Sequence, residues 1–479
     1  MSKQVPMTRR GVLCTGSAFA SLSLLSPMRA AVAQQSDEPL RLRAAPSKAE
    51  LRPAPYGLTD VWSYNGAVPG SEIRVRQGDQ IRVLAENRLQ EGTTIHWHGI
   101  RTPNAMDGVA FLTQDPIPVN GDFQYEFDAL DAGTFWYHPH QRSFEQLGRG
   151  LYGPLIVEEA EPIRVDRDVT WMLDDWRMTN DGQLSNDFGN QGDAMHGGRI
   201  GNTVTINGQI PDRMAVQAGE RIRLRLINAA NARIFGLDFG DLDPVVITMD
   251  GQPVVPHAPD GGIIVIGPAM RVDVVIDFTG KPGDLLSVND VYYKDLEFRL
   301  VDFAYGSDAL RQTVPDWSMV LAPNPLADPD IKNATRHQIV FNGGMMGQMM
   351  MGDGMGSMMG QMRQGNIWFI NGKAANGPIL DPLLTLPLGT SHILEMENRT
   401  AWPHPIHLHG HTFRVIARNG QPTRHLEWQD TVMMAPREKV DIAFVADNPG
   451  DWMFHCHIME HQAAGMMGVI RVELDATKT

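Results

Sequence analysis

Positive charge, cysteine and long apolar runs are all scarce in this chain of 479 residues. No apolar run approaches the roughly 20 residues that a membrane-spanning helix needs, so we expect no membrane span. The formal net charge of −15 disfavours nucleic acid as a partner, because an acidic surface repels a polyanion. We therefore expect neither a membrane span nor a nucleic-acid partner. We also expect the protein to be a monomer.

The N-terminal segment differs from the rest of the chain in composition. Arg9 and Arg10 precede an apolar, Ser/Ala-rich stretch over residues 11–25, and the small residues 31–33 follow. This order of basic, apolar and small-residue regions predicts a twin-arginine export signal over residues 1–33. A disordered basic tail is the alternative. The signal predicts a periplasmic or otherwise exported protein.

The chain contains two cysteines, and Cys14 lies inside the predicted signal. The mature protein would keep Cys456 alone, so it cannot form an internal disulfide although exported proteins commonly use them. A single thiol in an oxidising compartment therefore needs another explanation.

One sequence pattern occurs three times: an Asn-Gly turn, a connecting stretch, and a strand with alternating apolar residues. The copies cover residues 64–87, 206–228 and 370–398. Each is later followed by a Gly-containing turn and a final strand, at residues 131–133, 281–283 and 448–450. The pattern predicts an all-β chain of three β-sandwich domains. We place them at residues 34–160, 161–316 and 330–479, with a linker at 317–329.

Histidines form four His-X-His pairs among the 16 histidines of the chain. The pairs are His96/His98, His138/His140, His407/His409 and His455/His457. Residues i and i+2 of a strand face one side, so each pair can present two imidazoles to one metal ion. A single pair could equally be an ordinary polar face. Two pairs in the first domain and two in the third predict a cluster of eight imidazoles between them.

The second domain has no such pair. By analogy with its neighbours, the pairs would fall at residues 228–233 and 286–289. We therefore expect this domain to act as a spacer that kept the fold without the ligands.

Cys456 lies between His455 and His457, so on a strand its sulfur faces away from the two imidazoles. A Cys thiolate, two His nitrogens and a weak axial Met form a blue-copper electron-transfer site. His404, His461 and Met466 complete that set. A buried inert cysteine is the alternative. One strand would then serve two metal sites, and electrons would pass from Cys456 through its backbone to His455 and His457.

Four motifs give the chain a family resemblance over nearly its whole mature length. They are residues 96–99 (HWHG), 136–140 (WYHPH), 404–410 (HPIHLHG) and 455–466, which begins HCH. The chain resembles three-domain bacterial multicopper oxidases of the laccase and copper-efflux oxidase group. That resemblance implies cupredoxin-like Greek-key domains, four coppers, and the oxidation of a donor in four one-electron steps while dioxygen is reduced to water.

The resemblance also implies a ligand set for one type 1, one type 2 and two type 3 coppers. Type 1 copper would be bound by His404, Cys456, His461 and the axial Met466. Type 2 copper would be bound by His96 and His407. The type 3 ions would be bound by His98, His138 and His457 on one side and by His140, His409 and His455 on the other.

Proton delivery is the second expectation from the resemblance. Asp107 stands where similar enzymes place an acid near the copper cluster, which would assist proton transfer to oxygen. A plain Asp-Gly turn at Asp107 and Gly108 is an equally good interpretation. Many relatives carry Glu directly after the last type 1 histidine, whereas this chain has Gln462, whose amide cannot relay protons as an acid does.

The electron donor is suggested by a Met/Gly segment over residues 343–362. Its methionines are Met345, Met346, Met349, Met350, Met351, Met355, Met358, Met359 and Met362. Thioethers are soft ligands that favour Cu(I), and copper-efflux oxidases place a Met-rich insertion here. Cu(I) oxidation with a role in periplasmic copper tolerance is therefore the favoured function.

Three alternatives stay open. The Met/Gly segment could be a disordered, oxidation-prone loop. Residues 400–403 lack the acid and Met that copper-efflux oxidases present there, so a laccase acting on phenols or aromatic amines is a second candidate. A noncatalytic copper-binding scaffold is a third, which a count of one copper or none would favour.

Overall fold

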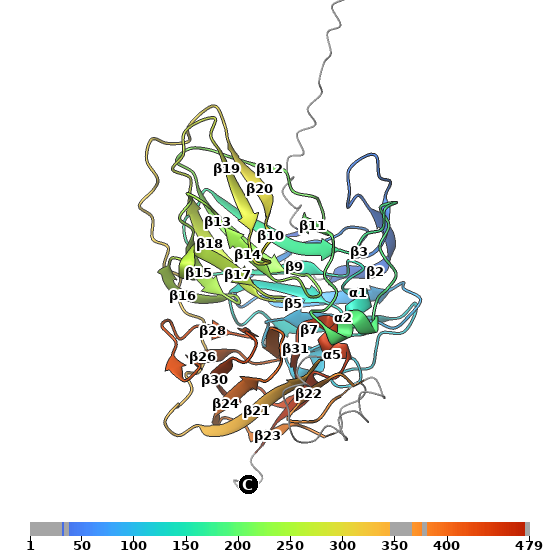
Figure 1. Cartoon of the computed structure of the whole chain (residues 1–479). Helices are drawn as coiled ribbons and strands as arrows, with labels where there is room; N and C mark the ends of the chain where they lie inside the picture. The colour runs from blue at the N-terminus through green and yellow to red at the C-terminus, as the bar shows by residue number, and fades with distance from the viewer. Residues whose placement is uncertain (1–30, 33–37, 345–365, 376–380, 475–479) are drawn as a thin grey trace, which may run out of the picture.

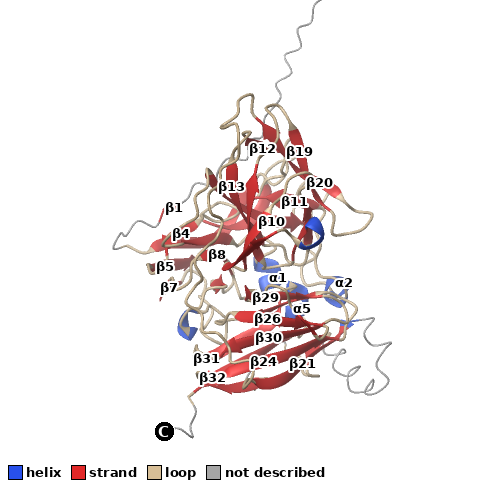
Figure 2. Cartoon of the chain, turned by 90° about the vertical axis from the view of Figure 1, so that its left-hand side faces the viewer, coloured by secondary structure: helices blue, strands red, loops and turns tan. Residues whose placement is uncertain are grey.

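Three two-layered β-sandwiches follow one another along the chain in the computed structural model, which describes residues 31–32, 38–344, 366–375 and 381–474. Strands make up 46% and helices 5% of the structure, which confirms the predicted all-β class. The last sandwich, orange to red in Figure 1, lies below the other two, and Figure 2 shows the same arrangement after a quarter turn.

The first sandwich pairs a five-stranded sheet of order β1-β4-β9-β8-β6 with a four-stranded sheet of order β3-β2-β5-β7. Its strands are β1 (Ala31–Val32), β2 (Leu40–Ala49), β3 (Thr59–Tyr64), β4 (Ile73–Arg76), β5 (Gln80–Asn87), β6 (His96–His98), β7 (Asp122–Asp128), β8 (Gly133–His138) and β9 (Gly153–Glu158). Alternating residues such as Val83, Phe127 and Trp97 fill the space between the sheets, as a period of two requires. Strand β1 lies within the predicted export signal and pairs in parallel with β4.

The second sandwich has sheets of order β11-β10-β13-β18-β15-β16 and β12-β20-β19-β14-β17. Its strands are β10 (Arg167–Trp176), β11 (Thr203–Ile206), β12 (Arg213–Val216), β13 (Arg221–Asn228), β14 (Phe235–Asp238), β15 (Val245–Met249), β16 (Gln252–His257), β17 (Ile263–Ile266), β18 (Arg271–Asp277), β19 (Leu285–Asp290) and β20 (Phe298–Tyr305).

Strand β14 occupies the place that β6 has in the first sandwich. Leu237 of β14 faces Asp290 of β19, as His96 faces His138. Our placement of the first missing pair at residues 228–233 was therefore several residues too early, because the loop after β13 separates Asn228 from the equivalent strand. Residues 286–289, our placement of the second pair, do lie on β19.

The third sandwich has sheets of order β22-β21-β24-β30-β26-β27, with β28 beside β26, and β23-β32-β31-β25-β29. Its strands are β21 (Thr335–Gly343), β22 (Trp368–Ile370), β23 (Leu384–Pro387), β24 (Ser391–Asn398), β25 (His404–Leu408), β26 (Phe413–Arg418), β27 (Gln421–Pro422), β28 (Trp428–Gln429), β29 (Thr431–Met434), β30 (Lys439–Val445), β31 (Gly450–Cys456) and β32 (Met467–Glu473).

Helices are short and lie at the junctions between sandwiches. They are α1 (Ser143–Gln146), α2 (Gln191–Met195), α5 (Met459–Ala463) and the 3-10 turns η1 (Asn104–Met106) and η2 (Asp260–Gly262). Helix α5 contacts both α1 and α2, so segments from all three sandwiches meet there. None of the helices in the described ranges is long and apolar enough to cross a membrane.

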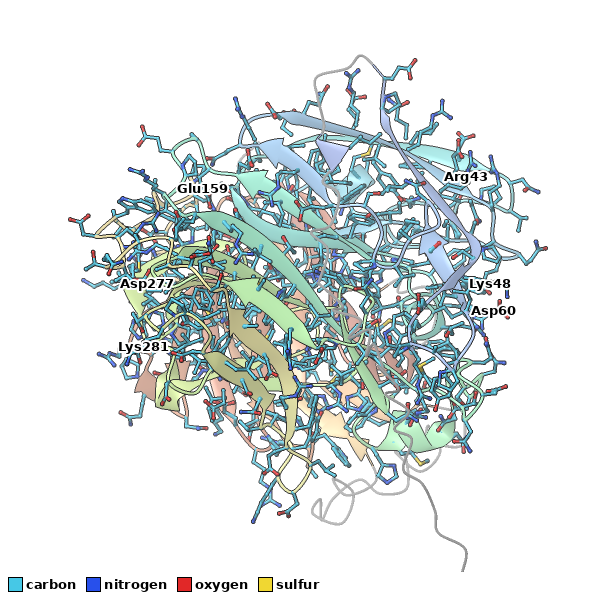
Figure 3. All side chains as sticks on the ribbon, turned by 90° about the horizontal axis from the view of Figure 1, so that it is seen from above. Arg43, Lys48, Asp60, Glu159, Asp277 and Lys281 are labelled. Atoms are coloured by element: carbon cyan, nitrogen blue, oxygen red, sulfur yellow. The ribbon has the colours of Figure 1, made fainter. Side chains whose placement is uncertain are left out.

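Buried ion pairs join the first two sandwiches. Arg223 binds Asp273 and Glu159, and Arg225 binds Asp273 and the Thr134 hydroxyl of the first sandwich. Glu159, labelled in Figure 3, lies at the start of the connection between the two sandwiches. These charges are paired and hydrogen-bonded, as buried charges must be.

Candidate metal centre

Eight imidazoles meet between the first and third sandwiches, as the four His-X-His pairs predicted. Antiparallel pairing sets His96 of β6 opposite His138 of β8, and His407 of β25 opposite His455 of β31. The two sets interleave, because the rings of His96 and His409 have centroids 3.9 Å apart and those of His98 and His407 lie at 3.8 Å. All eight side chains are no more than 6% exposed.

Several of these imidazoles lie close enough to share an ion. The ligand atoms of His140, His409 and His455 fall within 4.8 Å of one another, as do those of His96, His407 and His409. The Nε2 atoms of His138 and His457 are 3.4 Å apart. His98 lies beside His138 and His457, and its ring centroid is 5.0 Å from that of His457.

Six of the eight imidazoles bond an oxygen atom through one ring nitrogen, which leaves the other nitrogen for a metal. His96 Nδ1 donates to the Asp107 carbonyl at 2.8 Å, and His407 Nδ1 donates to the Asp430 carbonyl at 2.8 Å. Within the described cluster, five buried ring nitrogens have no hydrogen-bond partner: His96 Nε2, His98 Nδ1, His140 Nε2, His407 Nε2 and His457 Nδ1. Unpaired buried nitrogens are costly, so this donor set fits bound metal ions.

Burial favours the neutral form of six imidazoles of the cluster. It lowers the pKa of His98, His138, His140, His409, His455 and His457 well below the ordinary value, and the neighbouring imidazoles lower these pKa values further. Neutral imidazoles are the form that binds metals.

Cys456 and two histidines form a separate site on the other face of β31. Cys456 Sγ lies 3.4 Å from His404 Nδ1 and 3.8 Å from His461 Nδ1, and these two nitrogens are 3.2 Å apart. Burial raises the pKa of the Cys456 thiol well above its usual value, so a bound cation is needed to hold it as the thiolate. Strand β31 therefore contributes side chains to both ligand groups.

The outer nitrogens of these two histidines are already hydrogen-bonded. His404 Nε2 lies 2.8 Å from Thr400 Oγ1, and His461 Nε2 donates to the carbonyl of His196 at 2.6 Å. His196 directly follows α2, so the second sandwich covers this edge of the site. Met466 is fully buried in the same core, and its carbonyl accepts from Cys456 N at 3.0 Å.

Asp107 lies against the imidazole cluster. Its carboxylate is 3.0 Å from His409 Nδ1 and 3.2 Å from His96 Nδ1, and the residue is 1% exposed. The turn interpretation also holds, since Gly108 has φ +80° and a Cβ there would lie 1.8 Å from the Ile95 carbonyl oxygen. The backbone turn brings the acid to the cluster.

Gln462 lines a cavity of about 430 Å³ that reaches His140. Apolar and sulfur-containing side chains such as Phe111, Met453 and Met459 form much of the remaining wall. No carboxylate lies among the lining residues of this cavity in the described structure. The nine methionines of the 343–362 segment, Met345 to Met362, lie outside the described residues.

Two acids near the sites were missed from the sequence. Asp430 lies 3.1 Å from His98 Nε2, and Glu460 accepts from the backbone N–H of Arg199 at 3.1 Å. Burial raises the pKa of Glu460 to about 7. Asp430 lies outside every His motif, and Glu460 lies within the 455–466 motif but received no role from the sequence. Both acids have partners in other sandwiches, which no local sequence signal indicated.

Known proteins match the chain along almost all of its length. Three family models described as multicopper oxidase match residues 47–162, 167–299 and 355–476. Multicopper oxidase MmcO of Mycobacterium tuberculosis is 32% identical over 441 residues, covering 85% of this chain and 82% of the relative.

Solved structures agree in fold. The multi-copper oxidase of Pseudomonas thermotolerans is 33% identical with a TM-score of 0.80, and the match covers 93% of this chain and all of that one. A Campylobacter jejuni multicopper oxidase described as a metallo-oxidase is 27% identical with a TM-score of 0.77, covering 94% of each chain. With its three cupredoxin-like sandwiches and its clusters of histidines suited to metal binding, the chain belongs to the bacterial multicopper oxidases, which bind four copper ions of types 1, 2 and 3.

Proposed function

We propose that the chain couples four one-electron oxidations of a donor, with Cu(I) favoured, to the reduction of dioxygen to water. The observation that carries this proposal is the pair of ligand groups on the two faces of β31. The proposed type 1 ligands are His404, Cys456, His461 and the axial Met466. The proposed type 2 ligands are His96 and His407, and the type 3 ligands are His98, His138, His457, His140, His409 and His455.

Bound copper would supply the redox chemistry, by accepting single electrons from the donor and delivering four of them to dioxygen. The chain supplies the connection, since Cys456 is covalently bonded to His455 and His457, which face the other site. Hydrogen bonds to oxygen atoms hold the rings of His96, His98, His138, His407, His409 and His455, which limits structural change when electrons move.

Asp107 is the proposed proton-handling group. Its Oδ2 atom holds the Nδ1 proton of His409, and burial excludes bulk water from this contact. A carboxylate in hydrogen-bond reach of the cluster can pass a proton to reduced oxygen. Gln462, on the cavity that reaches His140, carries no exchangeable acid proton, so Asp107 bears the larger part of this task.

Two features support Cu(I) as the favoured donor. The Met/Gly segment offers nine soft thioethers. In the described structure His461 is fully buried and its outer nitrogen is bonded to the His196 carbonyl, which limits direct contact with a bulky phenol. The description of the Campylobacter jejuni relative as a metallo-oxidase agrees with a metal-ion donor.

A laccase acting on phenols or aromatic amines is the second candidate. Residues 400–403 offer no acid or thioether for a donor copper, and Thr400 is engaged with His404. Trp402 instead presents a half-buried indole beside the ring of His196, at a centroid distance of 5.8 Å. An aromatic donor could stack on such a surface.

Export and copper tolerance complete the proposal. The Arg9-Arg10 pair ahead of an apolar stretch supports a twin-arginine signal and a periplasmic site of action. Oxidation of Cu(I) to Cu(II) there is the step through which the protein would act in copper tolerance, and one relative is described as a copper resistance protein A homolog.

Steady-state oxygen uptake by the copper-loaded protein tests the donor directly. We expect kcat/KM for Cu(I) to exceed that for a simple phenol by at least tenfold. His461→Ala, which removes a proposed type 1 ligand, is the control and should abolish both activities. A phenol preference in the four-copper protein would favour the laccase alternative, and one copper or none per chain would favour a noncatalytic scaffold.

A further inference from the structure

Asp430 lies between two imidazoles of the cluster. Its Oδ1 atom is 3.1 Å from His98 Nε2, and its backbone carbonyl accepts from His407 Nδ1 at 2.8 Å. Thr431 reinforces both contacts, because its hydroxyl lies 3.1 Å from each ring. The position of this two-residue segment therefore sets the orientation of one proposed type 2 ligand and one proposed type 3 ligand.

Arg271 of the second sandwich binds the Asp430 carboxylate of this two-residue segment. Its Nη1 atom donates to Asp430 Oδ1 at 2.8 Å and its Nη2 atom donates to Oδ2, so the guanidinium binds the carboxylate through both oxygens. Both side chains are buried, with Arg271 fully inaccessible. A bidentate pair of this kind fixes geometry as well as charge.

Asp250 fixes the backbone of the same segment. Its Oδ2 atom accepts from the N–H groups of Asp430 at 3.2 Å and Thr431 at 3.0 Å, while Oδ1 accepts from Arg271 N at 3.0 Å. The second sandwich thus holds Asp430 by side chain and backbone together. Arg271 lies 159 positions and Asp250 lies 180 positions from Asp430 in the chain.

The first sandwich closes the junction. Arg271 Nε donates to the Thr134 carbonyl at 3.1 Å, and a Cβ on Gly99 would lie 2.3 Å from Arg271 Nη2. Gly99 directly follows His98, so a side chain there would displace the guanidinium from the carboxylate. The three sandwiches therefore converge on Arg271 immediately behind the cluster.

The Asp430 carboxylate is not free to act as a metal ligand itself. His98, His407 and Asp430 lie close enough to hold an ion, but both oxygens of the carboxylate already face the Arg271 guanidinium. His407 contacts the Asp430 carbonyl through Nδ1, and its Nε2 atom has no partner in the described structure. Asp430 therefore acts through the imidazoles it orients.

We propose that Arg271, with Asp250, is a positioning residue for type 2 copper, through which the second sandwich holds Asp430 and thereby His407. This inference rests on the proposed assignment of His407 to type 2 copper. The second sandwich is then more than the spacer predicted from its lack of ligands. Removing such a supporting contact lowers metal affinity by about 10- to 100-fold in general.

The Arg271→Lys variant tests this positioning role, because lysine keeps the positive charge but cannot form the bidentate pair with the Asp430 carboxylate. We expect the variant to bind type 2 copper at least tenfold more weakly than the wild type, as measured by competition with a chelator. We also expect an altered type 2 hyperfine splitting in the EPR spectrum. The type 1 absorption, measured in the same sample, should stay unchanged because Cys456 contacts none of these groups. Asp250→Asn should act in the same direction and serves if Arg271→Lys fails to fold.

Arg225→Lys is the matched control. Arg225 is equally buried, also lies between the first two sandwiches, and binds Asp168 and Asp273 instead of the cluster. The Arg225→Lys variant should retain type 2 copper and the type 2 EPR spectrum, even where its free energy of unfolding is lower than that of the wild type. Equal type 2 loss in both Lys variants, or a normal type 2 spectrum in Arg271→Lys, overturns the inference. Absence of a type 2 signal from wild-type protein loaded with copper, or its persistence in His407→Ala, overturns the assignment of His407 itself.

Discussion

His409 and Asp107, which lie 302 positions apart in the chain, share a hydrogen bond of 3.0 Å between Nδ1 and Oδ2. The contact crosses the boundary between the third and first sandwiches. It places an acid at the cluster although the residue also ends a turn, so the two interpretations of the Asp107-Gly108 sequence are compatible.

Asp107→Asn tests the proton role of this acid. The amide keeps the size of the side chain and loses the ability to carry a proton, so oxygen reduction should slow by about 10²-fold or more. Reduction of type 1 copper by the donor should remain fast. Anaerobic stopped-flow for the first half-reaction and oxygen consumption for the second measure the two separately. Equal slowing of both, or of neither, would leave Asp107 with a structural role alone.

The sequence predicted the fold and the two ligand groups because both depend on local, repeated patterns. His-X-His on a strand presents two rings to one side, and Cys456 between two histidines must face the other. Three turn-and-strand repeats were enough to indicate three sandwiches.

The parts that the sequence did not predict depend on contacts between distant segments. Arg271 lies 159 positions from Asp430, and neither belongs to a metal-binding motif. The His196 carbonyl that covers His461 is a backbone group, which no residue type can indicate. The position predicted for the second-domain equivalent of the first histidine pair was too early, because alternation of apolar residues does not determine the length of the loop after β13.

Cys456→Ser should remove the strong red absorption of the loaded protein and reduce turnover to background. The serine hydroxyl is a hard, weakly acidic ligand, so it cannot form the copper–thiolate bond that gives the colour. Visible spectroscopy and oxygen uptake measure the two effects. The EPR signal of the eight-histidine cluster should persist as the control for folding. A variant that kept both colour and turnover would show that another group binds type 1 copper.

A histidine pair away from the copper sites should make the stability of the third sandwich depend on pH. Burial, with His337 and His411 nearby, lowers the pKa of His392 to about 4, so the fold holds the neutral ring. The stability that this provides is complete above the unfolded pKa of about 6.5 and is lost as the pH falls through about 4.

Between pH 7.5 and pH 4.5, the Tm of His392→Gln should therefore fall by about 2 °C less than the Tm of the wild type. This difference corresponds to a contribution to the free energy of unfolding of about 1 kcal/mol, reduced for solvent screening. His257→Gln, which removes a ring from the His257–His425 stack, is the control for the loss of one histidine side chain. Copper content must be equal at both pH values. Equal Tm losses in all three proteins would show that the His337–His392 contact does not titrate in this range.

The Met/Gly segment gives the last prediction, because its nine thioethers on a Gly-rich chain suit capture of Cu(I) better than packing in a core. Deleting residues 345–362 should lower kcat/KM for Cu(I) several-fold or more. We propose that the segment also covers the type 1 site, so its deletion should leave bulky phenol oxidation unchanged or raise it by opening access to that site.

Replacing the nine methionines with leucine separates ligation from access. Leucine keeps the apolar volume and removes the sulfur, so Cu(I) oxidation should fall as in the deletion while phenol oxidation stays at the wild-type rate. Copper content and red absorption must first match the wild type, since a destabilised third sandwich would lower both activities together. Unchanged Cu(I) kinetics in either variant would mean that the donor copper is captured elsewhere, and would favour a laccase whose donors meet the chain near Trp402 and His196.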